Sequence, residues 1–274
     1  MADELEQAQK ALRDLRKSLK SLPGDTAPKA IHKLRTASRR VEALAAALTV
    51  GDRKQVRRML QSIELVRKAA GGVREVDVLM AHARRLARAG AGDSLTRLAE
   101  HLAGVRQEKT DELRRVLERR RKTSRESLKQ YSKLVKSVLA GAKPAAPRLP
   151  ALSLKRVRAA AMEILRGLGA WPPLDASNLH AFRLKVKLLR YTMQLDAEAE
   201  PNLVEELGEV QRRVGDWHDW QQLEEIAREV LDAKLDAPLL DRIGRTTKRR
   251  FAQSLSAANL LRERYLAMPL ANGV

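Results

Sequence analysis

The sequence predicts an all-α protein, and two observations carry this prediction. Apolar residues recur at spacings of three and four along nearly the whole chain, which is the period of an amphipathic helix. Only eight of the 274 residues are aromatic, three Trp, three Tyr and two Phe, so the core must consist of Leu, Ala, Val and Ile. This mixture suits close-packed helices better than sheets, because strands favour aromatic and β-branched side chains.

The composition limits the class of protein further. The 54 Lys and Arg outnumber the 34 Asp and Glu, which gives a net charge of +20, while 44% of the chain is hydrophobic, as in folded proteins. The absence of cysteine excludes disulfides, thiolate zinc sites and cysteine nucleophiles. The N-terminus is acidic, unlike a secretory signal, and the apolar run 41–50 is too short to span a bilayer. We expect a soluble cytoplasmic protein that has a polyanionic partner and no membrane association.

The helical period and the turn residues divide the first half into five helical segments. Pro23 and Gly24 stop the first of them, Asp25 or Thr26 caps the second, and the glycine pair at Gly71 is expected to end the third. The expected helices cover residues 5–22, 26–49, 53–70, 74–88 and 93–140.

The second half repeats this order after the proline-rich segment 141–150, which is the clearest linker in the chain. Its helices are expected over 152–168, 175–198, 201–215, 217–231 and 238–267. The repetition predicts an internal duplication, in which residues 1–140 and 151–274 each form a helical bundle.

Two related basic strings support the duplication. The first string is His32-x-x-Arg35-x-x-x-Arg39, and the second string is His180-x-x-Arg183-x-x-x-Lys187-x-x-Arg190. The two histidines are 148 positions apart, and Gly71 and Gly215, each expected to form a glycine-acid turn after its string, are 144 positions apart. The strings therefore occupy corresponding helices of the two halves.

A helical wheel places the second string between two apolar arcs. With His180 at 0°, the three basic residues that follow lie at about 280–340°. This geometry predicts that the basic stripe points into a gap inside the protein, with both shoulders packed. The first string has thinner apolar flanks, and Glu42, which takes the place of Arg190, either weakens the field or pairs with a neighbouring arginine. The two predicted shoulders of the second string are Leu184, Leu188, Tyr191 and Leu195 on one side, and Leu179, Phe182, Val186, Leu189 and Met193 on the other.

Inward-facing arginines need an anionic counterpart, because they cannot lose their charge on burial. The planar guanidinium fork suits phosphate oxygens, so an anionic phosphate ligand is expected. Bound phosphates would raise the pKa of the string histidines, so that lower pH tightens binding. Arg121 and Arg125 lie where a basic run interrupts the apolar seam of the segment 105–140, and they belong either to the same site or to a solvated helix face.

The segment 215–219 could be mistaken for a metal or acid–base cluster. The simpler interpretation makes Gly215 the end of one helix, Asp216 the N-cap of the next and Asp219 its capping-box partner. We therefore expect no metal site, no cofactor and no catalytic residues.

The strings and the segment Gly215-Asp216-Trp217-His218-Asp219 resemble the conserved histidine α-helical domain (CHAD) family over essentially the whole chain. The resemblance implies two four-helix bundles related by a pseudo-twofold axis, with a central basic pore that binds inorganic polyphosphate. It also implies a non-enzymatic role, in some relatives at polyphosphate granules. Glu42 and Leu188 depart from the family pattern. The residues that the resemblance assigns to the pore are His32, Arg35, Arg39, Arg40, His180, Arg183, Lys187 and Arg190.

Nonspecific nucleic-acid binding is the alternative function, because the net charge fits it. The scarcity of aromatic residues for base stacking and the lack of a recognised nucleic-acid-binding motif count against it. The preferred polymer length and the oligomeric state stay open.

Overall fold

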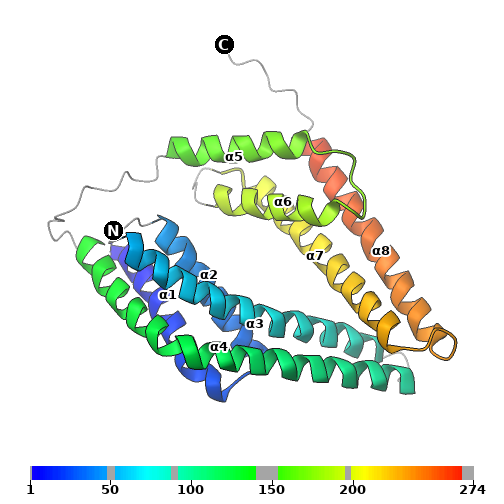
Figure 1. Ribbon diagram of the computed structural model, residues 1–274. Helices are drawn as coiled ribbons and strands as arrows, with labels where there is room; N and C mark the ends of the chain where they lie inside the picture. Colours follow the sequence, from blue (N-terminus) through cyan, green and yellow to red (C-terminus); the bar gives the residue numbers. More distant parts are fainter. Residues whose placement is uncertain (1, 48–52, 88–91, 140–153, 195–198, 267–274) are drawn as a thin grey trace, which may run out of the picture. The chain divides into compact units, whose positions relative to one another are not determined.

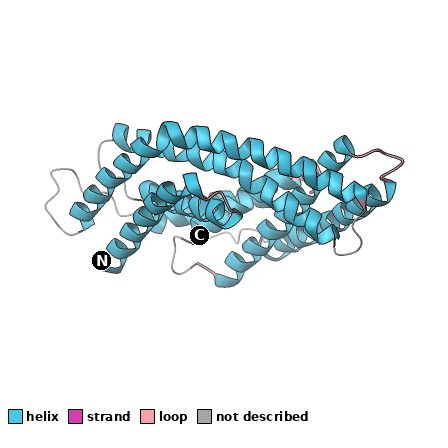
Figure 2. Cartoon of the chain, turned by 90° about the horizontal axis from the view of Figure 1, so that it is seen from below, coloured by secondary structure: helices cyan, strands magenta, loops and turns pink. Residues whose placement is uncertain are grey.

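The computed structural model describes residues 2–47, 53–87, 92–139, 154–194 and 199–266. Within these ranges every regular element is helical and no strand occurs, which confirms the all-α prediction (Figures 1 and 2). The predicted linker 141–150 lies outside the described residues. The principal helices are α1 (Ala2–Ser21), α2 (Pro28–Ala47), α3 (Arg53–Ala87), α4 (Asp93–Leu139), α5 (Leu154–Gly169), α6 (Leu179–Met193), α7 (Pro201–Val230) and α8 (Ala237–Leu261).

The chain forms two compact units, each with its own core. The first unit comprises Met1–Ala81 and Ala99–Ala151, and the second comprises His82–Leu98 and Leu152–Val274. The end of α3 and the start of α4 therefore belong to the second unit.

The core of the first unit is lined by aliphatic side chains from α1, α2, α3 and α4. Leu12, Ile31, Ile63 and Leu113 are almost completely buried there, as the helical period of each segment requires. The hydroxyl groups of Ser62 and Ser124 lie 2.6 Å apart inside the same unit, so two buried polar groups of α3 and α4 satisfy each other.

The core of the second unit packs α5, α6, α7 and α8 together. Phe182 of α6 is fully buried, and Trp217 of α7 packs against Phe251 of α8, with ring centroids 5.2 Å apart. Trp217 and Trp220 are each 3% exposed, so α7 places both indole rings in the interior of the unit.

Local hydrogen bonds set the ends of the helices in the second unit. Glu200 caps α7 by accepting hydrogen bonds from the backbone N–H groups of Asn202 and Leu203. The side chain of Asp175 accepts from the N–H groups of Ser177 and Asn178, which forms a turn, so α6 begins at Leu179 and not near residue 175 as predicted.

The buried Asp236 connects the loop before α8 to the start of α4. Its carboxylate accepts hydrogen bonds from Ser94 and Arg97 and from the backbone N–H of Asp232. These contacts explain why the beginning of α4 belongs to the second unit.

The expected helix ends at Gly71 and Gly215 are wrong. Helix α3 runs without a break through Gly71, and α7 runs through Gly215. Consequently Asp216 and Asp219 lie inside α7 and do not form the predicted N-cap and capping box. Glycine is less favourable than alanine inside a helix by about 1 kcal/mol, so its presence at both positions needs a reason, which the contacts of the two strings supply.

No helix in the described ranges is both long enough and apolar enough to cross a lipid bilayer.

Candidate anion-binding surfaces

The first string lies on α2, at the edge of the face that packs into the core of the first unit. Ile31 and Leu34 are fully buried beside it. The guanidinium groups of Arg35 and Arg39 belong to half-buried side chains, whereas His32 and Arg40 are exposed. The string therefore presents cations along a partly covered edge of the helix.

Arg35 lies directly on the backbone of α3. Its Nη1 donates to the carbonyl oxygen of Arg67 at 3.5 Å, and a Cβ at Gly71 would lie 2.5 Å from the same nitrogen. Only a glycine leaves room for the guanidinium at this distance. This contact is the physical reason for a glycine in the middle of α3.

The surroundings of Arg35 are crowded with positive charge. Burial lowers its pKa, the positive charges of Arg39, Arg67 and Arg74 lower it further, and Glu75 opposes them. Arginine stays charged in proteins despite such a shift. The cluster is therefore a site where an added anion relieves repulsion.

Glu42 has a partner in the same cluster. Its carboxylate accepts a hydrogen bond from Nε of Arg67 at 2.7 Å. This contact confirms the expectation that Glu42 pairs with a neighbouring arginine. Because that arginine lies on α3, the negative charge of Glu42 is offset without using a cation of the string.

The second string lies on α6, and its four basic residues are all half-buried. Arg183 Nε donates to the carbonyl oxygen of Gln211 at 3.1 Å, and a Cβ at Gly215 would lie 3.0 Å from its Nη2. Arg190 approaches the same helix near Gly208, where a Cβ would lie 3.3 Å from its guanidinium. Lys187 extends over the ring of Tyr191, with 5.9 Å between Nζ and the ring centroid.

The two units therefore share one arrangement. In each, an arginine of the string donates to a backbone carbonyl, and the glycine four residues after that carbonyl leaves space for the guanidinium. The carbonyls belong to Arg67 and Gln211, which are separated by the same 144 positions as the two glycines. This contact places a fixed guanidinium at corresponding positions of both repeats.

Two histidines meet in the second unit. The rings of His180 and His218 are 4.2 Å apart between centroids and tilted by 47°. Burial lowers the pKa of both, Arg183 lowers both further, and His180 adds to the effect on His218. Without an anion nearby, both imidazoles are therefore neutral at pH 7.

One of the two predicted apolar shoulders of α6 is confirmed, and the other is not packed within the second unit. Leu179, Phe182, Val186, Leu189 and Met193 are buried in the core. The opposite shoulder is not covered by the helices of the second unit, and Leu195 lies outside the described residues. The exposed fractions are 50% for Leu184, 49% for Leu188 and 42% for Tyr191.

Arg121 and Arg125 are half-buried on α4, and no contact joins them to the first string within the described ranges. Nε of Arg125 is buried without a hydrogen-bond partner there. The sequence left two interpretations of these arginines open, and these contacts favour neither.

Three elements of the site were missed by the sequence analysis: His218, the arginines of α3 beside Arg35, and the glycine contacts. The signal for His218 was its alignment with Arg74 at the spacing of 144 positions, which pairs one cation-forming residue with another. The glycine contacts were hidden because a glycine next to an acid is also typical of a helix end.

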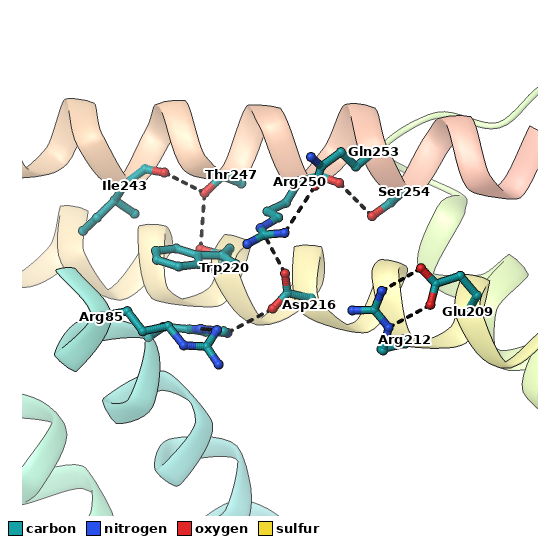
Figure 3. Close-up of polar contacts among 11 residues, drawn as sticks. Arg85, Glu209, Arg212, Asp216, Trp220, Ile243, Thr247, Arg250, Gln253 and Ser254 are labelled. Carbon is teal, nitrogen blue, oxygen red and sulfur yellow. Dashed lines mark hydrogen bonds and ion pairs between the residues drawn. The ribbon is translucent and has the colours of Figure 1, made fainter.

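Asp216 takes part in an ion pair with the neighbouring helix. Its Oδ2 lies 3.1 Å from Nε of Arg250 on α8 (Figure 3). Its Oδ1 lies 3.8 Å from Nε2 of His82. In the described part of the chain, no three His, Asp or Glu side chains form a group that could hold a metal ion.

Residues 6–228 match the family model described as CHAD domain, which is well over half of the chain. Neither the curated proteins nor the solved structures contained a match.

Proposed function

Because the chain belongs to the CHAD domain family, we propose that it binds inorganic polyphosphate through its two strings and does not cleave it. Membership in this family is consistent with a polyphosphate-related function. A cytoplasmic location and an association with polyphosphate granules are part of the same proposal.

The observation that carries the proposal is the arginine held against a glycine in each unit. Before any ligand arrives, Arg183 donates to a backbone carbonyl at 3.1 Å and Arg35 does so more weakly at 3.5 Å, so less side-chain entropy is lost when a phosphate binds. In each case the contact takes one of the five N–H donors of the guanidinium.

The chemistry of the polymer fits a surface of this kind. A polyphosphate chain has about one charge per phosphate and no apolar surface, so affinity must come from summed ionic contacts and from counterion release, by analogy with nucleic acids. Bulky apolar pockets are unnecessary. The half-buried His180 and His218 add a response to pH, because phosphates next to them would raise their pKa.

A gel-shift titration with polyphosphates of defined length tests the proposal. Arg183→Ala and Arg39→Ala should each weaken binding by about tenfold or more, since a charge-assisted hydrogen bond contributes about 1.5–3 kcal/mol. Arg13→Ala on the exposed face of α1 is the matched control and should bind like the wild type. Loss from both single changes supports binding by both strings, and loss from neither refutes the proposal.

Competition with duplex DNA separates the proposal from nucleic-acid binding. Polyphosphate should displace DNA at equal phosphate concentration, and DNA should not displace polyphosphate. Orthophosphate release from a polyphosphate chain by the purified protein would contradict the non-enzymatic role.

A further inference from the structure

The second unit contains an arginine-lined pocket that neither string contributes to. It has a volume of ≈ 520 Å³, within the range of about 300–1000 Å³ that is usual for small-ligand pockets. Its walls come from the end of α3, from α7 and from α8. The lining residues are Arg85, Leu86, Trp220, Arg242, Arg245, Thr246, Arg249 and Arg250.

This arginine pocket is separate from the surface of the second string. Gly208, Gln211 and Gly215 face α6, and they fall within about 60° on the wheel of α7. Measured from Gly215 on the same wheel, Asp216 and Trp220 lie about 100° and about 140° away. Both side chains lie toward α8 and the end of α3 (Figure 3). One helix therefore has a different cationic site on each of two faces.

The charge of the pocket is largely uncompensated. Arg250 pairs with Asp216, whereas the other four wall arginines form no ion pair with any described carboxylate, and the lining itself contains none. Among the described residues, the hydrogen bond of Arg85 is with the ring nitrogen Nδ1 of His82, at 3.4 Å. Where arginines lie together without counter-charge, the binding of a multiply charged anion is electrostatically most favourable.

Three of the wall arginines lie on the same face of α8. Arg242, Arg245 and Arg249 are spaced by three and four residues, so they project from one face of the helix. Trp220 lines the same pocket, and its buried indole nitrogen has no acceptor among the described residues.

This cluster is not a copy of something in the first repeat. The positions 144 residues before the three α8 arginines hold Leu98, His101 and Val105, none of which is a permanent cation. Helix α8 also begins at Ala237, beyond the last residue of the family match. The pocket is thus a feature of this chain's second unit.

The pocket has no exposed apolar face among its described lining residues, and this limits the class of ligand. Trp220 is 3% exposed and Leu86 is 4% exposed, so neither offers a face on which a nucleobase or an apolar group could stack. Recognition must rest on the anionic group alone. Guanidinium forks match phosphate oxygens, and several forks around one pocket require a ligand with several charges.

We propose that this arginine pocket is a second anion site, which binds a compact ligand carrying two or more linked phosphate groups. The ligand is either a free short oligophosphate or the end of a longer polyphosphate chain. The site does not depend on binding by the strings.

Isothermal titration of the full chain with tripolyphosphate tests the site. In an Arg35→Gln/Arg183→Gln background, which weakens the strings, a saturable site should remain. Adding Arg245→Gln and Arg249→Gln should weaken that site by at least about tenfold, because two charge-assisted contacts are lost. Both residues are exposed, so the fold should persist, which an unchanged melting temperature without ligand would verify.

The matched control adds Arg13→Gln and Arg57→Gln instead, two exposed arginines of the first unit, and should leave the titration unchanged. Adenosine triphosphate should bind no more tightly than tripolyphosphate. The affinity of the pocket for long-chain polyphosphate, counted per chain end, is then compared with its affinity for tripolyphosphate. Tighter binding of the long chain identifies the polymer end as the ligand, and equal affinity identifies the free short oligophosphate.

Equal tripolyphosphate affinity in the pocket variant and in its control would overturn the pocket but leave the function proposed for the strings intact. Absence of a saturable tripolyphosphate site in the string variant would also overturn the pocket.

Discussion

At the scale of single residues, burial decides which charges the protein carries before a ligand binds. Arginines keep their charge in half-buried positions. Backbone carbonyls accept hydrogen bonds from Arg35 and Arg183, and the carboxylate of Glu42 accepts one from Arg67. Histidines respond in the opposite way, because burial removes their charge. His82 is the clearest case: its ring stacks on Trp220 with centroids 4.6 Å apart, and burial lowers its pKa to about 4, although Asp216 opposes the shift.

The lowered pKa of His82 predicts acid sensitivity of the fold. Between pH 6.5 and pH 4 the unfolded chain binds a proton that the folded chain does not, so stability is complete above pH 6.5 and is lost as the pH falls. The free energy of unfolding should decrease by about 1.5 kcal/mol between pH 6.5 and pH 5 through this group. Urea denaturation of wild type and His82→Phe measures it, because phenylalanine keeps the stacking and cannot titrate. An equal pH dependence in both proteins would disprove the role of His82.

His180 and His218 predict that binding takes up protons. Both imidazoles are neutral in the free protein at pH 7, because burial and Arg183 lower their pKa, and phosphates would raise it again. Polyphosphate affinity should therefore rise as the pH falls from 7.5 to 6. Calorimetry at pH 6.5 in two buffers with different ionisation enthalpies counts the protons, and His218→Asn should reduce the count. A proton count of zero in the wild type would contradict the prediction.

At the scale of helices, the glycines explain both a success and a failure of the sequence analysis. The helical period predicted where each helix lies, because buried leucines must recur on one face. The continuity of α3 and α7 was not predictable from propensity, since glycine opposes a helix interior by about 1 kcal/mol. The glycine makes room for an arginine of another helix, which packs against Gly71 or Gly215. No pattern in the sequence next to either glycine predicts this contact.

The same limit applies to the rest of the site. The basic stripe of α6 could be placed on a wheel, but a wheel does not say which shoulder another helix covers, and Leu184 and Leu188 proved to be exposed. The arginine pocket escaped notice because Arg85 and Arg245 are distant in sequence and belong to no repeated string. Local periodicity predicts faces, whereas the pairing of faces depends on packing of the whole unit.

Alanine at the glycine positions tests the arginine contact. Gly104 lies in α4 with open space around it, so Gly104→Ala should raise the free energy of unfolding by up to about 1 kcal/mol. Gly71→Ala should gain less, because the new Cβ would displace Arg35, and it should weaken polyphosphate binding by about tenfold. Urea denaturation and a gel shift measure the two effects. Identical behaviour of the two variants would contradict the contact.

At the scale of the whole molecule, the chain has two separately packed cores and a large excess of positive charge. The net charge of +20 attracts any polyanion, so attraction alone does not identify a site. What distinguishes a site is cations fixed in position, and each unit fixes an arginine of its string in the same way. The central claim is therefore that these two arginines contact phosphates, and that the net charge alone does not account for binding.

The dependence of polyphosphate affinity on salt concentration tests this claim most directly. The logarithm of the affinity should fall linearly with the logarithm of the NaCl concentration in the wild type, and Arg35→Gln/Arg183→Gln should reduce the slope by about 1.5–2, close to one for each lost phosphate contact. Arg13→Gln/Arg57→Gln, which removes the same charge from exposed positions, should leave the slope nearly unchanged. If both double variants reduced the slope equally, or neither did, the arginines of the strings would not be the phosphate contacts.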